Sequence, residues 1–375
     1  MKPILVVLLL GLFIVLTFAF FNATQTPQVS ASIVGLQAST DIAGYARADH
    51  VRDFKFPDDH GPHPEFQTEW WYYTGNLQAR DGRRFGYQLT FFRRAITPTA
   101  APRESAWATN QIYFAHFALT DEKTNRHESS ERFSRGAAGL AGATGKPFRV
   151  WLETWEATAL NADGSRVQLR ADEAGRALDL TLAATKPPVL HGERGLSQKS
   201  ADAGNASYYI SFTRLDTTGT LTLNGETFAV TGSSWMDHEF STAVLGENAV
   251  GWDWFSIQLA DNRELMLFQI RQKDGSIEPL SSGTLVEPDG TARRLSREQF
   301  SIEALASWKS GATGATYPAV WRVTIPAREM VLTITPVIAD QEMRVSILYW
   351  EGAVEVSGTV RGVGFVEMTG YAGGK

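Results

Sequence analysis

Apolar and polar residues alternate in short runs along most of this chain. Residues 70–77, 84–93 and 110–120 carry an apolar or aromatic side chain at nearly every second position, which is the period of a β-strand with one buried face. The first two runs are joined at Asp81-Gly82, and such a pair between alternating runs is a strong signal for a β-hairpin. The pattern predicts antiparallel strands in this part of the chain.

The same pattern continues towards the C-terminus. Further strands are predicted at residues 148–160, 178–183, 208–215, 221–232, 252–260 and 263–271. Turns are predicted at Asp163-Gly164, Asn224-Gly225 and Asp261-Asn262. Two glycine-rich stretches, 136–145 and 192–204, are predicted to be loops, and residues 297–308 are the best candidate for a helix. The expected fold class is therefore all-β.

The two halves of the chain share features in the same order. Each half contains a hairpin that starts in a cluster of tryptophans and ends in arginine. Similar features in the same order indicate two related domains. We therefore expect two tandem antiparallel β-barrels, each with room for one small ligand. The expected boundaries are a linker at 32–54, a first barrel at 55–235 and a second at 236–375.

The N-terminal residues have the composition of a targeting segment. Lys2 precedes an almost wholly apolar stretch at residues 4–21, and Val29-Ser30-Ala31 offers small residues to a signal peptidase. The apolar stretch is also just long enough to span a bilayer. Residues 1–31 are therefore predicted to be a signal peptide or a retained anchor. Either alternative makes the protein periplasmic or secreted, or holds it at the outer face of the inner membrane.

Composition narrows the classes of function. Hydrophobic residues make up 43% of the chain and charged residues 20%, which suits a globular protein. The formal net charge is −6 and no basic stripe is present, so no nucleic-acid partner is expected, because such binding requires clustered Lys and Arg. The chain has no cysteine, which excludes disulfides, thiolate metal ligands and a cysteine nucleophile.

A first cluster of acids, histidines and aromatics lies at the start of the first predicted strand. Alternation places Glu69, Trp71 and Tyr73 on one face of that strand and Trp70 on the other. We predict that all four line a mostly apolar ligand pocket with a few convergent polar groups. In the alternative interpretation, Glu69 is a buried carboxylate that pairs with an arginine such as Arg93 and holds the barrel closed.

A second cluster of acids, histidine and tryptophans lies further along the chain. We predict ligand contacts from Trp235, Trp252 and Trp254, and catalysis by Asp237, His238 and Asp253. A carboxylic acid among indole rings stays protonated because burial raises its pKa, and a histidine can orient a water or take its proton. On a strand, His238 points away from the face that carries Asp237. Asp237 would therefore have to meet Asp253 across a strand pair.

Three strings resemble a known family: residues 64–72 (PEFQTEWWY), 235–239 (WMDHE) and 349–354 (YWEGAV). They are similar to signatures of the AttH-like and carotenoid 1,2-hydratase-like family, and the resemblance covers residues 60–371. It implies two lipocalin-like barrels in an exported or membrane-associated protein, often beside an ABC-type export transporter. Some members of that family hydrate the end double bond of an acyclic carotenoid without a cofactor, and others are labelled secreted hydrolases.

Two hypotheses for the function follow. In the first, the protein is a cofactor-free hydratase that acts on an apolar polyene, terpenoid or lipid. In the second, it carries such a molecule for an ABC-type export system, and the same residues are only structural. A metal site of His60, His63, Glu65 and His238 is not favoured, because the first three lie in a Pro/Gly loop without standard ligand spacing. Hydrolysis is less favoured, because no Gly-x-Ser-x-Gly elbow occurs beside the acids.

Overall fold

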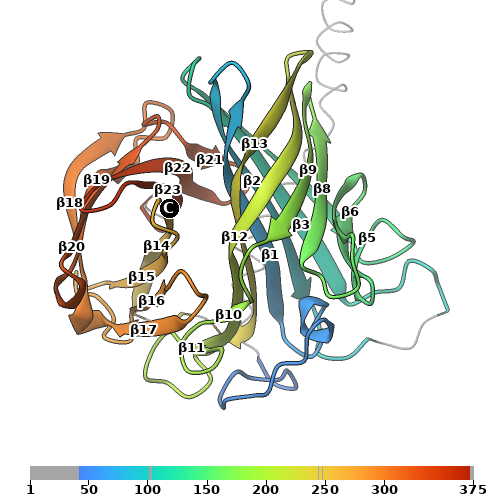
Figure 1. The fold of residues 1–375 in the computed structure, drawn as a ribbon. Helices are drawn as coiled ribbons and strands as arrows, with labels where there is room; N and C mark the ends of the chain where they lie inside the picture. Colours follow the sequence, from blue (N-terminus) through green and yellow to red (C-terminus); the bar gives the residue numbers. More distant parts are fainter. Residues whose placement is uncertain (1–41, 101–103, 244, 247, 372–375) are drawn as a thin grey trace, which may run out of the picture. The chain divides into compact units, whose positions relative to one another are not determined.

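The computed structural model describes residues 42–100, 104–243, 245–246 and 248–371. These residues belong to one compact unit, Ser39–Lys375, and nearly all of their regular structure is β (Figure 1). The predicted targeting segment lies outside the described residues. Within the described part, no helix has the length and apolar character that crossing a membrane requires.

The first sheet contains 13 antiparallel strands: β1 (Thr68–Ala79), β2 (Arg84–Ala95), β3 (Gln111–Asp121), β4 (Arg126–Arg135), β5 (Ala141–Gly145), β6 (Phe148–Leu152), β7 (Trp155–Ala159), β8 (Arg166–Glu173), β9 (Arg176–Ala184), β10 (Val189–Leu190), β11 (Leu196–Gln198), β12 (Ala206–Leu223) and β13 (Glu226–Ala243). Its order is β4-β3-β2-β1-β13-β12-β9-β8-β7-β6-β5, and β10 and β11 pair with β12. One 3-10 turn, η1 (Asp58–His60), precedes it. Strands β1, β12 and β13 are therefore central.

The second sheet contains 10 antiparallel strands: β14 (Ala249–Leu259), β15 (Glu264–Gln272), β16 (Ser282–Val286), β17 (Ala292–Ser296), β18 (Ser301–Lys309), β19 (Thr316–Ile325), β20 (Met330–Pro336), β21 (Glu342–Arg344), β22 (Leu348–Gly358) and β23 (Gly362–Met368). Two 3-10 turns, η2 (Arg297–Gln299) and η3 (Pro326–Arg328), interrupt it. Each sheet curls around its own apolar interior. The prediction of two lipocalin-like β-barrels is confirmed.

Side-chain alternation divides the central strands between two environments. Trp71 and Tyr73 of β1 lie in the interior of the first barrel, whereas Tyr72 and the part-buried Trp70 pack against residues of the second sheet. The predicted division of β1 into two faces is therefore confirmed. Between the outer faces of the two sheets lies a further apolar cluster, which we call the inter-sheet layer: Tyr72, Tyr209, Trp235, Trp254, Met266, Phe268, Ile270, Ala353 and Phe365.

Polar contacts and close packing fasten the two sheets together around this layer. The buried Gln258 amide of β14 donates to two carbonyl oxygens of the first sheet, at 2.8 and 2.9 Å. The buried Glu264 carboxylate accepts from the Lys186 ammonium at 2.8 Å. A Cβ placed on Gly86 of β2 would lie only 2.7 Å from the Ala353 Cβ, so glycine is what allows the sheets to approach there.

The predicted hairpins at Asp81-Gly82, Asn224-Gly225 and Asp261-Asn262 are confirmed, since each pair lies between paired antiparallel strands. The second turn has φ values of 51° and 84° at its two central residues. Two positive φ angles define the type I′ turn, whose twist matches that of the flanking strands, and Asn-Gly is the pair that adopts it most readily. Local sequence therefore determines these reversals.

Other local predictions are wrong. The single strand predicted at residues 148–160 is split, because the chain reverses at Glu153-Thr154 and places Leu152 opposite Trp155. Glu153 has a φ of 55°, in the left-handed region that usually signals itself by Gly or Asn. Part of the loop predicted at 136–145 is strand β5.

The helix predicted at residues 297–308 is also absent. Only η2 is helical there, and β18 then pairs with β19, so strand pairing overrides the modest helical propensity of the segment. The boundary expected between 235 and 236 falls inside β13, and the chain passes to the second sheet between Ala243 and Ala249. Strand β13 of the first sheet thus contains the whole string at residues 235–239.

Candidate functional site

The structure places the three predicted catalytic residues in three different environments. Asp237 faces the inter-sheet layer, where it contacts Trp235 and Tyr209. His238, the next residue of β13, points into the first barrel and stacks on Trp71 with ring centroids 5.0 Å apart. Asp253 of β14 faces the interior of the second barrel, opposite Met368 of its core. The expectation that Asp237 meets Asp253 is therefore wrong.

Asp237 is held by neutral hydrogen-bond donors. The Trp235 indole N–H donates to Oδ1 at 2.6 Å, the Tyr209 hydroxyl donates to Oδ2 at 2.8 Å, and the Ser211 hydroxyl also donates to Oδ1. The Trp254 indole, from the second sheet, donates to the Tyr209 hydroxyl at 2.8 Å. Both sheets thus contribute aromatic side chains to the surroundings of one carboxyl group.

The protonation of Asp237 follows from this environment. Its side chain is 4% exposed, and burial raises its pKa to about 7 although the hydrogen bonds from Ser211, Trp235 and Tyr209 oppose the rise. The nearby Glu239 charge adds to it. Its hydrogen-bond partners are all neutral, and it forms no ion pair within the described part of the chain, so protonation is its means of avoiding a buried charge.

Two further acids, which sequence reasoning missed as site residues, face the same layer. Glu351 of β22 lies directly opposite Glu367 of β23. The Tyr72 hydroxyl lies beside the Glu351 carboxyl without the geometry of a regular hydrogen bond. The Trp252 indole donates to the Glu367 carboxyl at 3.0 Å. The third family-like string at residues 349–354 contains Glu351 and could have indicated it, whereas no local signal marks Glu367.

Glu239 lies two residues after Asp237, on the same face of β13. It differs from Asp237 because it is paired with a cation. The Lys199 ammonium lies 3.1 Å from its Oε2, and the Ser207 hydroxyl donates to the same oxygen. Lys199 also lies 4.4 Å from the centre of the Phe268 ring, within the range of a cation–π contact. This ion pair closes one side of the inter-sheet layer.

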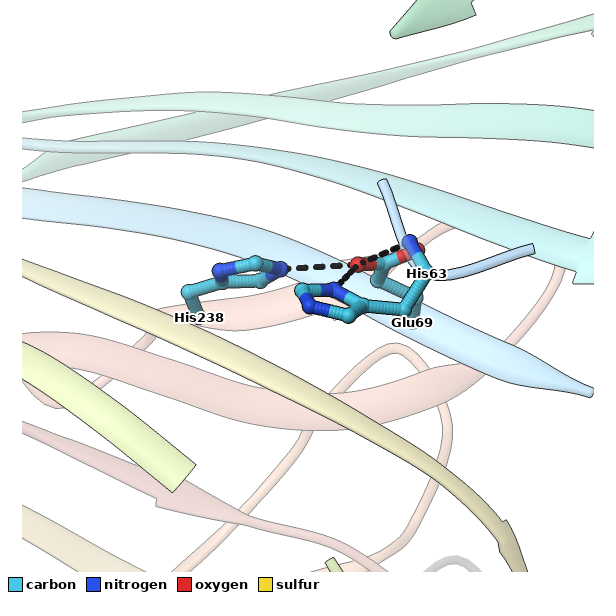
Figure 2. A group of neighbouring side chains, drawn as sticks. All are labelled: His63, Glu69 and His238. Atoms are coloured by element: carbon cyan, nitrogen blue, oxygen red, sulfur yellow. Dashed lines mark hydrogen bonds and ion pairs between the residues drawn. The ribbon is translucent and has the colours of Figure 1, made fainter. Parts of the chain in front are cut away.

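His238 belongs to a charged network inside the first barrel, drawn in Figure 2. The Glu69 Oε1 atom lies 2.8 Å from His238 Nε2 and 2.9 Å from His63 Nδ1 (Figure 2). Arg93 Nε donates to Glu69 Oε2 at 2.8 Å, and His63 Nε2 lies 3.0 Å from an Asp59 oxygen. The pairing of Glu69 with Arg93, which the sequence left open, is what the structure shows.

Opposite charges dominate the protonation of this network. Burial by itself would raise the pKa of Glu69, but the Arg93 charge and the two histidines outweigh it and hold the pKa well below its ordinary value. Burial opposes the protonation of His63, yet its bonds to Asp59 and Glu69 raise its pKa. Burial lowers the pKa of His238. The network is thus an ionised carboxylate surrounded by donors.

His63, Glu69 and His238 could be considered as metal ligands, because their possible ligand atoms all lie within 4.8 Å of one another. His60 and Glu65, which completed the set considered from sequence, are not part of this group. His63 Nδ1, His238 Nε2 and Glu69 Oε1 already take part in hydrogen bonds with one another, and the Arg93 guanidinium occupies the second oxygen of Glu69. The other ring nitrogen of His238, Nδ1, has no partner among the described residues. A metal would displace protons beside a fixed positive charge, so the donor set fits a hydrogen-bonded network better.

Asp253 also has a cation. Arg271 Nε lies 3.2 Å from its Oδ1, Gln269 donates to Oδ2 at 2.8 Å, and the Tyr371 hydroxyl donates at 3.0 Å. Burial nevertheless raises the pKa of Asp253, against the opposing charge of Arg271. This environment contains none of the tryptophans predicted to contact ligand.

The predicted ligand-contacting residues also divide into two sets. Trp235 and Trp254 are buried in the inter-sheet layer, and the part-buried Trp70 and Trp252 pack against it. Glu69, Trp71 and Tyr73 lie instead in the interior of the first barrel, which is filled by side chains. A cavity of about 10 Å³ that Tyr73 helps to line has room for about one water. The inter-sheet layer is therefore where the predicted residues gather.

Two antiparallel barrels joined through a buried aromatic layer define a class of tandem lipocalin-like proteins. The AttH-like family matches residues 47–371. A protein described as AttH from Nitrosomonas europaea is 35% identical, and the match covers 87% of this chain and 99% of that chain with a TM-score of 0.79. The chain belongs to the AttH-like family.

More distant structures share the fold. Kievitone hydratase from Nectria haematococca is 15% identical over 87% of this chain and 95% of that chain, with a TM-score of 0.66. The protein CghA is 14% identical over 88% of this chain and 97% of that chain, with a TM-score of 0.50. No curated protein sequence matches this chain.

Proposed function

We propose that this protein is a cofactor-free acid–base enzyme of the hydratase type, which adds water to a double bond of an apolar molecule at the inter-sheet layer. Asp237 is the acid. The observation that carries this proposal is a buried carboxyl group among Trp235, Tyr209 and Trp254, with its pKa raised to about 7 and only neutral hydrogen-bond partners among the described residues.

The chemistry of hydration explains why this environment suits the reaction. Protonating an unactivated double bond requires a carboxylic acid that is still protonated at neutral pH, which burial provides. The resulting carbocation is stabilised by aromatic faces, and the rings of Tyr72 and Trp254 meet edge to face here with centroids 5.2 Å apart. A positioned proton donor contributes about 10²–10⁴-fold to such a step.

His238 and Asp253 are structural in this proposal. His238 is bonded to Glu69 inside the first barrel, and Asp253 is paired with Arg271 inside the second. His238 does not share the environment of Asp237, because adjacent residues of a strand point to opposite faces. Asp253 does not share it either, because it faces the interior of the second barrel. The hypothesis of a catalytic group made of all three residues is therefore replaced by one centred on Asp237.

The comparisons support the reaction class only through the fold. Kievitone hydratase has the same two-barrel fold, and its name assigns a hydration to that protein. We further propose a polyene, terpenoid or lipid as the substrate class, from the aromatic lining. We propose export to the periplasm from the apolar segment at residues 4–21, and an ABC-type exporter as a partner from the family resemblance.

The test uses the full chain and a panel of acyclic terpenoids, polyenes and prenylated phenols in D₂O. We expect incorporation of one deuterium on carbon and a mass gain of one water. Asp237→Asn should reduce turnover by about 10²-fold or more while ligand binding, followed by tryptophan fluorescence, is kept. Asp179→Asn, at an exposed position of β9, is the matched control. Binding without deuterium incorporation in the wild type would contradict the enzyme and indicate a carrier.

A further inference from the structure

Glu351 and Glu367 form a carboxyl pair that the role of Asp237 does not explain. They are directly opposed residues of neighbouring antiparallel strands, and side chains at such positions lie on the same face within reach of each other. That face is turned towards the first sheet, since Ala353 and Phe365, two residues along each strand, belong to the inter-sheet layer. The two acids therefore meet inside the layer.

The surroundings of the pair contain no charge that would neutralise it. The groups that face Glu351 are the Tyr72 and Tyr349 hydroxyls and Glu367. The side chain of Glu351 is 2% exposed, and both its Oε1 atom and the Tyr72 hydroxyl have no hydrogen-bond partner among the described residues. Buried polar atoms are almost always bonded, so the Tyr72 hydroxyl and the Glu351 carboxyl, which lie beside each other, are left with unused hydrogen-bonding capacity inside the layer.

The groups around Glu367 connect the pair to the acid already described. Trp252 donates a hydrogen bond to Glu367, and the charges that act on it include Asp237 and Glu239. Tyr72 is the direct cross-strand neighbour of Asp237 on the first sheet and lies beside Glu351 of the second. The Tyr72 hydroxyl is thus a group on which the charges of Glu351, Glu367 and Asp237 all act.

Electrostatics requires the pair to keep a proton. Burial and the neighbouring Glu367 charge raise the pKa of Glu351 well above its ordinary value. Burial also raises the pKa of Glu367 to about 7, against the Trp252 hydrogen bond. Glu351 is buried and Glu367 is part-buried, and two carboxylates side by side in such a site cannot both ionise easily, so one proton is shared. At neutral pH the pair thus offers a protonated and an ionised carboxyl together.

We infer that Glu351 and Glu367 are the base of the proposed hydration, and that Tyr72 is the positioning residue that returns the proton from this pair to Asp237. This inference rests on the proposed function. Asp237 gives its proton to one alkene carbon, and the π electrons form the new C–H bond. The water oxygen forms the C–O bond to the cationic carbon, and one water proton passes to the ionised carboxyl of the pair.

The cycle then closes without another reactant. The pair has gained one proton and Asp237 has lost one, so a proton transfer through the Tyr72 hydroxyl restores both groups. An acid and a base held at one site are the arrangement that general acid–base catalysis requires. The two sheets each supply one of them, so the site is complete only across the inter-sheet layer.

The test combines infrared spectroscopy with kinetics on the full chain. Because Asp237 is itself partly protonated at pH 7, the spectra are recorded on Asp237→Asn, which should still show the absorption of a protonated buried carboxyl at pH 7, and Glu351→Gln in this background should remove most of it. Glu367→Gln and Glu351→Gln should each lower kcat by about 10²-fold. The rate of the wild type should fall on both sides of neutral pH, and Glu367→Gln should abolish the fall on the acid side. Glu355→Gln, at an exposed position of β22, should change neither measurement.

Three outcomes are decisive. Absence of the protonated-carboxyl band in the folded Asp237→Asn variant would overturn the shared proton. Turnover within threefold of the wild type in both glutamine variants, with the pH profile unchanged, would overturn the role of the pair while the hydratase proposal stands. A band that Glu351→Gln removes, in a protein that hydrates no member of the panel, would support the shared proton and overturn hydration. Tyr72→Phe should slow turnover without removing the band.

Discussion

Two groups of buried carboxyls lie beside tryptophans in this protein, and they differ in their partners. Inside the first barrel, Glu69 is bonded to Arg93, His63 and His238, and its pKa is held well below the ordinary value. In the inter-sheet layer, Asp237 has only neutral donors, and its pKa is raised to about 7. Both regions contain a buried carboxyl group beside tryptophan. They differ in that Glu69 is paired with a cation, whereas the hydrogen-bond partners of Asp237 are neutral.

The difference teaches how the same kind of side chain takes different roles. A buried carboxylate with a fixed cation and several donors stays ionised and holds structure, and removing its charge leaves the cation unpaired. A buried carboxyl without a cation becomes protonated near neutral pH, which suits proton transfer. The comparison therefore favours a structural role for the Glu69 network and agrees with the chemistry proposed for the inter-sheet layer.

The largest expected effect comes from breaking the Glu69 network. Glu69→Gln leaves the buried Arg93 and His63 without their carboxylate, and loss of one partner of a buried ion pair costs about 3–5 kcal/mol. Urea unfolding at pH 7 should show this loss of unfolding free energy. The exposed Glu65→Gln should leave it within about 0.5 kcal/mol. Equal stability of the two variants would contradict the structural role of the network.

The two regions should also respond to pH in opposite directions. The folded pKa of Asp237 is about 7 against an ordinary 3.8, so between these values the folded protein holds a proton that the unfolded chain has lost. Its contribution to stability therefore falls as pH rises from about 4 to about 7, by roughly 1.4 kcal/mol per pH unit. The lowered pKa of Glu69 gives the opposite sign, with stability lost as pH falls below about 4.5.

Unfolding free energies of the wild type, Asp237→Asn and Glu69→Gln across pH 4–8 test this contrast. The difference between wild type and Asp237→Asn should fall as pH rises, because contributions from other groups cancel in the subtraction. The difference between wild type and Glu69→Gln should not fall in the same way. Parallel curves for all three proteins would refute the assignment of opposite protonation states.

A smaller effect is expected from Tyr209→Phe. This change removes the hydrogen bond to Asp237 and leaves the Trp254 indole without its acceptor, at a cost of about 1–3 kcal/mol. Because that bond lowers the pKa of Asp237, the titration of Asp237 should shift to higher pH. Tyr208→Phe, which removes a bond to the His50 carbonyl on the other face of β12, should leave the titration in place. A titration unchanged in both variants would contradict this contact.

The smallest effect is expected at Asp253. The raised pKa of this group means that its surroundings do not favour the charge, in spite of Arg271. Asp253→Asn keeps the shape of the side chain, so we expect a change within about 1 kcal/mol in unfolding free energy and turnover within twofold of the wild type. A loss of turnover comparable to that of Asp237→Asn would return Asp253 to the catalytic group.

Much of the fold could be predicted because its signals are local. Neighbouring residues alone indicate the Asn-Gly and Asp-Gly turns and the alternation of β1 and β13. The structure contains these features as expected. The turn at Glu153-Thr154 could not be predicted, because the positive φ of Glu153 is imposed by the strands it joins. The strand at β18 arises in the same way, from pairing with β19.

The sequence by itself determined which residues of each strand share a face, since the period of two is fixed by backbone geometry. It thereby placed His238 and Asp237 on opposite faces of one strand, and Glu69 on the same face as Trp71 and Tyr73. Only the tertiary structure decided which faces meet. The register of β22 and β23 set Glu351 against Glu367, and the packing of the two sheets brought Tyr72 to that pair. Register and packing depend on contacts between residues far apart in the chain, which local patterns do not encode.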